Sequence, residues 1–358
     1  MAYAAISKPS LHFTTKLYTG SGSAGHSITG VGFQPDWVWI KSRSGTHNAA
    51  NHRIYDAVRG VTKVIYSNLN NAEGTDAQGL TAFGTDGFTL GTENQSNGSS
   101  TEFASWNWKA GTTGSGTTTG SGTGKAYSYS VNTTNGFSVV KYGGNATSGH
   151  TIPHHLGAAP KWVIIKKLDG AARSWVCHHD ALDAGKVINL DTTDAANTLT
   201  TAFNSTDPSS TVITLGTSDF VNGNGNTYVA YCFAEKKGYS KFGKYLGNGN
   251  ADGTFVYTGF KPAWVLVKRS SSSTGQYWEL KDSKRDTDNP VTQKLSPNAS
   301  DSETSISGEE WDFLSNGFKI KTTGAGSNAD GVTNIYIAFA EEPLVANVGT
   351  NGVPATAR

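Results

Sequence analysis

Hydrophobic and polar positions alternate with a period of two along most of the chain, and this is the period of a β-strand. Near residue 106, for example, Trp106 and Trp108 share one face, while the smaller Ser105 and Asn107 share the other. No stretch shows the i, i+3, i+4 pattern of a core helix, and we expect at most one short helical turn around 55–58. The pattern therefore predicts an all-β chain in which sheets pack on sheets.

The pattern repeats three times. A proline, one further residue, Trp-Val, two apolar residues and a lysine occur in GFQPDWVWIKSR (32–43), GAAPKWVIIKKL (157–168) and GFKPAWVLVKRS (259–270). The anchors of these repeats are Trp37, Trp162 and Trp264, and each is followed at a similar distance by a closing strand that carries Trp108, Phe233 or Phe339. Both faces of the anchor strand are apolar, so we expect it to be central in its sheet. The spacing predicts a tandem array of three antiparallel β-sandwich modules of jelly-roll or concanavalin-like type.

The repeat divides the chain into five parts. We expect residues 1–110, 125–236 and 237–343 to form the three modules. Residues 111–124 contain only glycine, serine and threonine, which predicts a flexible linker. Residues 344–358 are expected to form a tail that docks loosely or takes part in an assembly contact.

Composition and charge narrow the class of protein further. The 358 residues carry 29 basic and 28 acidic side chains, a balance that lacks the basic excess of nucleic-acid-binding proteins. No apolar run is long enough to span a membrane, and the first residues do not form the apolar core of a cleaved leader. Two cysteines, Cys177 and Cys232, are too few for a disulfide scaffold. We therefore expect a soluble protein made in the cytoplasm, with no nucleic-acid partner and no membrane insertion.

No group of residues predicts catalysis, a metal site or a cofactor. The segment Cys177–Asp180 carries zinc-ligand types, but strand alternation places at most two of its cysteine and histidine side chains on one face. The adjacent carboxylates Glu309 and Glu310 would point to opposite faces of a strand, which does not suit glycoside hydrolysis. Cys232 has no base partner in the repeat and is interpreted as a small buried hydrophobe. We expect a non-enzymatic protein.

The loop 52–60 is the best candidate for a ligand or subunit contact. Its side chains Arg53, Tyr55, Asp56 and Arg59 offer charge, hydrogen bonds and an aromatic ring. They suit recognition of a sugar or a neighbouring subunit, and an internal Arg–Asp pair is equally compatible with the sequence.

The repeated lysines Lys41, Lys166 and Lys268 are a second candidate. They could bind an anion, but lysines at the end of a buried strand usually keep their charged ends in water. We therefore expect exposed ammonium groups.

The strings HFTTKLYTGSG, GFQPDWVWIKSR, RIYDAVRG, DGFTLG and FAEEP resemble a family of repeat-built, lectin-like or tail-fibre-like structural proteins of marine and cyanobacterial tailed phages. The resemblance covers essentially the whole chain, although RIYDAVRG is expected to have no counterpart in the second and third copies. It implies a virion protein assembled in the host cytoplasm, with other virion proteins and a host glycan as partners. It also implies a homo-oligomer, for which we expect a trimer.

Within that resemblance, a tail fibre or receptor-binding component is the first functional hypothesis. A capsid decoration protein that stabilises the phage head is the alternative. A glycan-degrading tailspike is the least supported, and the family has no catalytic residues to carry over to this chain.

Overall fold

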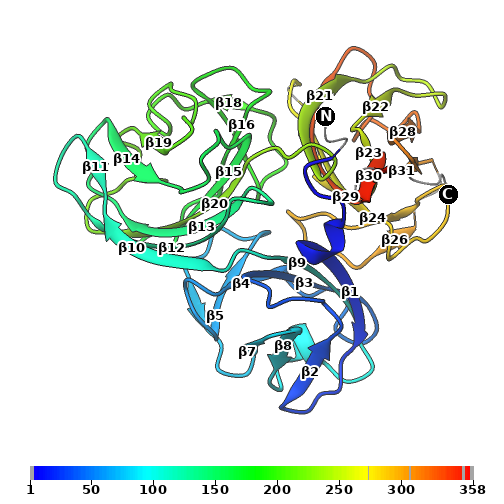
Figure 1. Ribbon diagram of the computed structural model, residues 1–358, viewed down its shortest axis with the longest axis horizontal. Coiled ribbons are helices and arrows are strands. Elements are labelled where there is room, and N and C mark those ends of the chain that lie inside the picture. Colours follow the sequence, from blue (N-terminus) through cyan, green and yellow to red (C-terminus); the bar gives the residue numbers. More distant parts are fainter. Residues whose placement is uncertain (1–3, 273, 306–307, 349–350, 355–358) are drawn as a thin grey trace.

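The computed structural model describes residues 4–272, 274–305, 308–348 and 351–354, and these residues form an all-β structure (Figure 1). Within this described part, the helical elements are the short η1 (Pro9–Leu11) and α1 (Asn94–Asn97). Where at most one short helical turn was expected, around 55–58, strand β4 (Arg53–Asp56) continues to Asp56 and a hydrogen-bonded turn follows it.

Three large antiparallel sheets contain the same order of four strands, with the closing strand paired on one side to the first strand and on the other to the anchor strand. The first sheet has β1 (Phe13–Thr19), β9 (Glu102–Trp108), β3 (Trp37–Ser44) and β4; the second has β13 (Phe137–Gly143), β20 (Thr227–Phe233), β15 (Trp162–Lys167) and β16 (Val176–His179); the third has β21 (Ser240–Leu246), β29 (Thr333–Pro343), β23 (Phe260–Arg269) and β24 (Glu279–Asp282). Additional strands widen the first two sheets: β5 (Lys63–Tyr66), β6 (Gly74–Thr75), β10 (Thr112–Thr117), β12 (Ala126–Asn132), β17 (Lys186–Asn189) and β18 (Asn197–Thr198).

The repeated aromatic residues occupy one register position in the three large sheets. Cα partners across the strands are Trp37 and Trp108, Trp162 and Phe233, and Trp264 and Phe339. Each anchor strand has a partner strand on both sides, as its two apolar faces predict.

A smaller three-stranded sheet packs against one face of each large sheet. The smaller sheets contain β2 (His26–Thr29), β8 (Gly87–Leu90) and β7 (Leu80–Gly84); β11 (Thr119–Gly120), β14 (His150–Pro153) and β19 (Val212–Leu215); and β22 (Phe255–Tyr257), β28 (Gly317–Lys321) and β27 (Glu310–Leu314). In the first pair, Ile28 and Phe88 of the small sheet pack with Val38 and Ile40 of the large one. We call these combinations the first, second and third sheet pairs. Two two-stranded sheets complete the fold: β25 (Gln293–Lys294) with β26 (Thr304–Ser305), and β30 (Val345–Val348) with β31 (Asn351–Pro354).

In each large sheet, the face turned away from the smaller sheet is directed toward the centre of the molecule (Figure 1). The side chains on these three faces form one shared aromatic core. Trp108, Phe233 and Phe339, one from each closing strand, form a triangle with ring centroids 5.5–6.2 Å apart. Such separations are typical of favourable aromatic pairs. The three sheet pairs therefore surround a common core, instead of following one another as separate beads in an array.

The prediction of a flexible linker at 111–124 is wrong. Strand β10 pairs with β12 along its whole length, and β11 adds to the edge of β14. Gly120 in β11 has a φ of +83°, and a Cβ there would lie 2.3 Å from the carbonyl oxygen of Gly149. Glycine therefore permits close strand pairing here, whereas the composition alone suggests freedom of the chain.

The prediction of a loosely docked tail at 344–358 is wrong in part, because two tail segments pair with each other. Val345–Val348 and Asn351–Pro354 pair as an antiparallel hairpin. Tail residues 349–350 and 355–358 lie outside the described residues.

Replacing Gly120 with alanine should lower the free energy of unfolding by about 1–3 kcal/mol, because the left-handed backbone and the contact with Gly149 both disfavour a Cβ. Urea denaturation measures this change. Thr113→Ala, at an exposed position of the neighbouring strand β10, is the control and should change stability little. Equal stabilities of the two variants would contradict the pairing of β11 with β14.

Candidate functional site

The four polar residues of the candidate loop are buried. Arg53, Tyr55, Asp56 and Arg59 are 3%, 0%, 0% and 7% exposed. Asp56 and Arg59 form an ion pair, and Arg53 donates a hydrogen bond to the Tyr55 hydroxyl at 3.0 Å. The structure therefore contains the internal Arg–Asp pair, and none of these side chains is open to an external ligand.

Asp56 also connects two sheet pairs. The hydroxyl of Tyr231, from strand β20 of the second sheet pair, donates to the Asp56 carboxylate at 2.7 Å. Burial raises the pKa of the Tyr231 hydroxyl well above its usual value, so it remains a donor at neutral pH. The contact made by this loop is thus between parts of one chain.

The third sheet pair has a counterpart of this motif, and the expectation that the motif is confined to the first copy is wrong. Arg285 donates through Nε to Asp282 at 2.5 Å and through Nη2 to the carbonyl of Leu280 at 3.0 Å. Arg59 makes the same two contacts, to Asp56 and to the carbonyl of Ile54. The two copies share only the spacing Asp-x-x-Arg at the end of a buried strand. The residues around it differ, so the sequence comparison did not identify the second copy.

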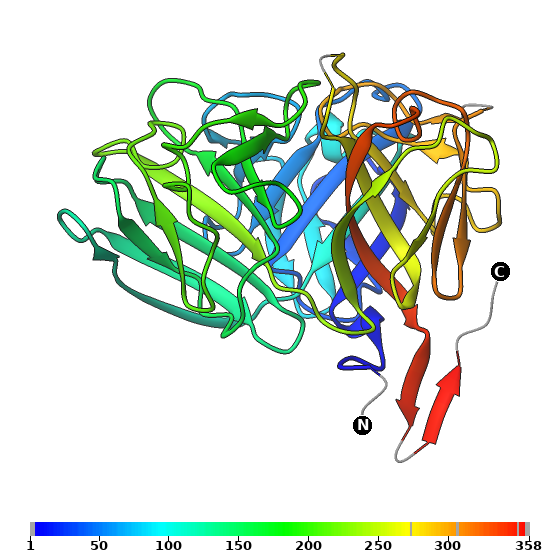
Figure 2. The same cartoon turned by 90° about the horizontal axis from the view of Figure 1, so that it is seen from above.

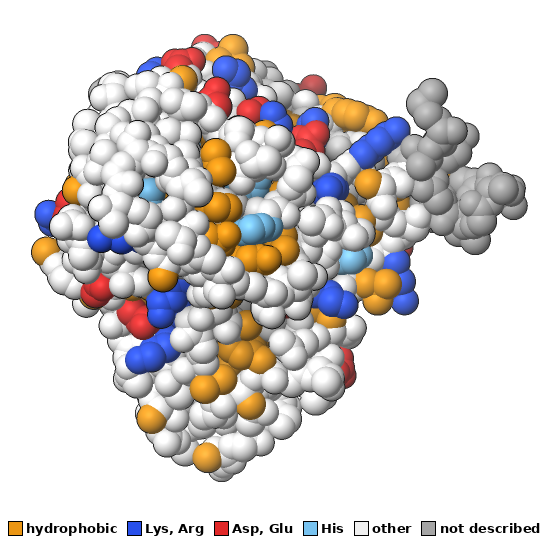
Figure 3. All heavy atoms as spheres, turned by 60° about the vertical axis from the view of Figure 1, so that its left-hand side comes forward, with side chains coloured by type: hydrophobic (Ala, Val, Ile, Leu, Met, Phe, Trp, Pro, Cys, Tyr) orange, Lys and Arg blue, Asp and Glu red, His pale blue; other side chains and the backbone are white. Residues whose placement is uncertain are grey.

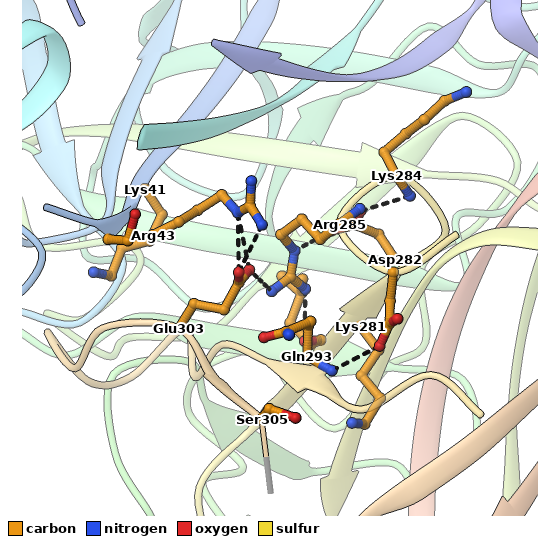
Figure 4. A network of polar contacts seen from close by, with 12 residues as sticks. Lys41, Arg43, Lys281, Asp282, Lys284, Arg285, Gln293, Glu303 and Ser305 are labelled. Atoms are coloured by element: carbon orange, nitrogen blue, oxygen red, sulfur yellow. Dashed lines mark hydrogen bonds and ion pairs between the residues drawn. The ribbon is translucent and has the colours of Figure 1, made fainter. Parts of the chain in front are cut away.

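Glu303 joins the third sheet pair to the first (Figure 4). Its carboxylate accepts from Arg285 Nη1 at 2.8 Å and from Arg43 Nη2 at 2.7 Å, and Arg43 Nε lies 3.0–3.1 Å from both of its oxygens. The backbone N–H of Glu303 also donates to the carbonyl of Arg43 at 3.0 Å. We call such a contact region between two sheet pairs a seam. Two arginines around one carboxylate form strong charge-assisted hydrogen bonds, so this seam is stabilised by charge as well as by a backbone hydrogen bond.

The other two seams repeat the backbone contact in the same direction. The N–H of Glu73 in the first sheet pair donates to Leu168 in the second at 2.9 Å, and that of Ala196 in the second donates to Ser270 in the third at 3.1 Å. These backbone hydrogen bonds run from the first sheet pair to the second, from the second to the third and from the third to the first. The three sheet pairs therefore form a closed ring. Sequence reasoning missed Glu73 and Glu303, because nothing near them in the chain marks their distant partners.

The three repeated lysines lie at these seams, and the prediction that their charged ends reach water is wrong. Lys41, Lys166 and Lys268 are 0%, 0% and 1% exposed. Their ammonium groups donate at 3.0–3.1 Å to carbonyls of covering loops: Lys41 to Asn48, Lys166 to Asn70 and Lys268 to Thr193. For Lys166 and Lys268 that loop comes from the preceding sheet pair, which the strand sequence cannot show. These donors already have acceptors, so the lysines do not form an anion site. Lys166 and Lys268 also link neighbouring sheet pairs, whereas Lys41 binds a loop of its own sheet pair.

Stability should rise with pH above neutrality because of these lysines. Burial lowers the pKa of Lys41 to about 7 and those of Lys166 and Lys268 to about 8. In the unfolded chain a lysine titrates near 10.4, so between these values the unfolded state binds more protons and stability increases with pH. Urea denaturation between pH 7.5 and 9 should show an increase of up to about 1.4 kcal/mol per pH unit for each lysine.

The Lys41→Met variant should show a smaller slope over this pH range, because one of the contributing groups is gone. Lys63→Met removes a partly exposed lysine instead and should keep the wild-type slope. A wild-type free energy of unfolding that is flat or falls from pH 7.5 to 9 would contradict buried, weakly basic lysines.

The histidine-rich strand β16 is part of the core. Cys177, His178 and His179 are 0%, 5% and 0% exposed, and His179 Nε2 donates to the carbonyl of Tyr336 at 3.1 Å. Burial lowers the pKa of both histidines to about 4 and raises that of the Cys177 thiol. Within the described residues, no three His, Cys, Asp or Glu side chains are grouped as a metal would require.

Two of the larger surface hollows lie at different ends of the strands. A hollow of about 320 Å³ lies beyond the end of β3 and is lined by polar side chains that include His47, Asn48, Asn51 and Gln95. Another, of about 380 Å³, lies where β23 begins. Figure 3 shows few, scattered charged side chains on the face over the second sheet pair, with hydrophobic side chains gathered in groups.

The family described as "Domain of unknown function (DUF7483)" matches residues 8–343. No curated protein and no solved structure matches the chain. Among the described residues, no helix is long and apolar enough to cross a membrane.

Proposed function

The chain belongs to the DUF7483 family, and we propose that it is a non-enzymatic surface protein of a tailed-phage virion, a tail fibre or receptor-binding component that attaches to host surface glycans. The observation that carries this proposal is the closed ring of three sheet pairs around one aromatic core. Such a ring is a rigid support, and rigid supports commonly carry binding loops at their ends.

The chemistry of the surface supports a glycan as the ligand. The polar hollow beyond β3 offers the amides of Asn48, Asn51 and Gln95 and the ring of His47. Amide and imidazole groups both donate and accept hydrogen bonds, which is what sugar hydroxyls require. The nearly neutral net charge and the mostly uncharged face in Figure 3 do not favour a polyanion as the partner.

Binding of the purified protein to host cells and to their isolated envelope polysaccharide tests the proposal. His47→Ala and Asn48→Ala should each weaken binding by about tenfold, the loss expected for one or two hydrogen bonds to a ligand. Ser115→Ala, in the unrelated strand β10, is the control and should bind like the wild type. Absence of binding to host polysaccharide would overturn the glycan proposal.

Capsid decoration is the second candidate, and the closed threefold arrangement favours it. A ring of three similar sheet pairs matches the surroundings of a threefold position on an icosahedral shell. A decoration protein would be present in hundreds of copies per particle, so copy number separates it from a fibre.

A further inference from the structure

The β30–β31 hairpin projects from the body of the molecule (Figure 2). Within the described residues, its two strands pair only with each other. A two-stranded hairpin is marginally stable in water unless other structure packs against it. Residues 344–357 also contain no charged side chain, so the hairpin lacks the charges that usually protect an edge strand from pairing. These features indicate a segment that pairs with something outside its own sheet pair.

Strand β22 presents an open sheet edge close to the base of this hairpin. It is the outer strand of its sheet and is paired on one side with β28. The carbonyl of Thr254 accepts from the N–H of Ile320 in β28, and the N–H of Thr258 donates to the carbonyl of Asn316, just before β28. Antiparallel alternation therefore directs the backbone groups of Phe255 and Tyr257 toward the open side. The side chains of these two residues are 44% and 58% exposed, and β22 carries no charge.

The second sheet pair shows that this edge accepts an added strand. In the second sheet pair, strand β14 corresponds to β22. Each of these strands follows the first strand of its large sheet in the chain, and each is paired within its smaller sheet, β14 with β19 and β22 with β28. On its open side β14 is paired by β11, with Thr119 opposite Thr151 and Gly120 opposite His150. In the third sheet pair no described strand takes the position of β11.

We propose that the β30–β31 hairpin of one molecule adds to the open edge of β22 in a second molecule, and that the second molecule returns the same contact. The two parts lie in one patch, because Tyr257, Gly259, Leu344 and Val345 line the same hollow of about 380 Å³. The N–H of Leu344 also donates to the carbonyl of Gly259 at 3.2 Å. A patch that carries both the strand and its receiving edge is self-complementary, as a twofold dimer requires.

Strand addition would satisfy the open backbone groups and bury exposed aromatic surface in one step. Main-chain hydrogen bonds supply affinity in this mode of association, and side chains beside the added strand supply specificity. Phe255 and Tyr257 are the side chains in that position. The proposal concerns self-association, and it stands or falls independently of glycan binding.

Sedimentation velocity of the full chain, from low to high micromolar concentration, tests the dimer. The wild type should reach twice the 37.7 kDa chain mass. The double variant Phe255→Lys/Tyr257→Lys should remain a monomer, while Ser27→Lys/Thr29→Lys, at exposed positions of the corresponding strand β2, should dimerise like the wild type. Circular dichroism and urea denaturation establish that each variant folds.

Hydrogen exchange provides a second measurement on the unaltered chain. The amides of Phe255 and Tyr257 should be protected at high concentration and exchange faster when the protein is diluted. A wild type that stays monomeric, a lysine double variant that still dimerises, or concentration-independent exchange of these amides would each overturn the proposal.

Discussion

Replacing Phe233 with alanine should lower the free energy of unfolding by about 3–5 kcal/mol and should weaken all three sheet pairs together. The Phe233 ring comes from the second sheet pair, but its centroid lies 5.7 Å from those of Trp37 in the first and Phe339 in the third. It also lies 5.0 Å from Trp162 in its own sheet. A cavity at this position therefore removes contacts from every sheet pair, and the close-packed surroundings have little freedom to fill it.

Urea denaturation gives the size of this loss, and hydrogen exchange shows where it acts. The amides of β9, β20 and β29 should lose protection to a similar extent, because these strands share the core. Tyr277→Ala removes an aromatic side chain that is 47% exposed and should change neither measurement appreciably. Loss of protection confined to β20 would show that the sheet pairs have separate cores.

Arg285→Met should also lower the free energy of unfolding, by about 3–5 kcal/mol, because removing one partner of a buried ion pair leaves the other charge buried without compensation. The side chains of Arg285 and Asp282 are 0% exposed, and that of Glu303 is 10% exposed. Without the guanidinium, Asp282 keeps a buried carboxylate with no cation, and Glu303 retains only Arg43. Methionine conserves much of the packing volume, so the lost charge dominates the effect.

An exposed ion pair of the same sequence spacing is the control. Asp183 and Lys186 are three residues apart, like Asp282 and Arg285, but their side chains are 76% and 44% exposed. Lys186→Met should leave the urea midpoint essentially unchanged, because solvent screens such pairs. Equal effects of the two substitutions would contradict a buried, stabilising seam between the third and first sheet pairs.

The sequence pattern predicted the strands of the shared core because the relevant information is local. The period of two placed Trp37 and Trp39 on one face and Val38 and Ile40 on the other, and those faces enter two different cores. The repeat spacing also identified the closing strand, and the structure pairs it with the anchor strand so that Trp37 lies opposite Trp108. Strand alternation and repeat spacing are properties of neighbouring residues, so they can be recognised without the fold.

The predictions that failed concern contacts between distant segments or segments rich in glycine. Residues 111–124 look unstructured, yet backbone pairing to β12 and β14 orders most of them without any side-chain pattern. Lys166 and Lys268 were expected at the surface because the loops that cover them belong to other sheet pairs, such as the loop with Asn70 over Lys166. Glu303 and Arg43 are 260 positions apart, so no local signal could pair them.

Within the candidate loop, the sequence pattern left the role of the polar residues open. The Arg–Asp pair was one of two alternatives, and burial decides for it. The spacing Asp-x-x-Arg at Asp282 and Arg285 could have been recognised, and it would have suggested a structural role shared by two sheet pairs.

The most direct test of the virion proposal is the copy number of this protein in purified particles, measured by quantitative mass spectrometry against the major capsid protein. A surface attachment component should be present at a few per cent of the capsid protein. A nearly stoichiometric ratio would contradict attachment and support decoration of the shell, and absence from the particle would contradict both.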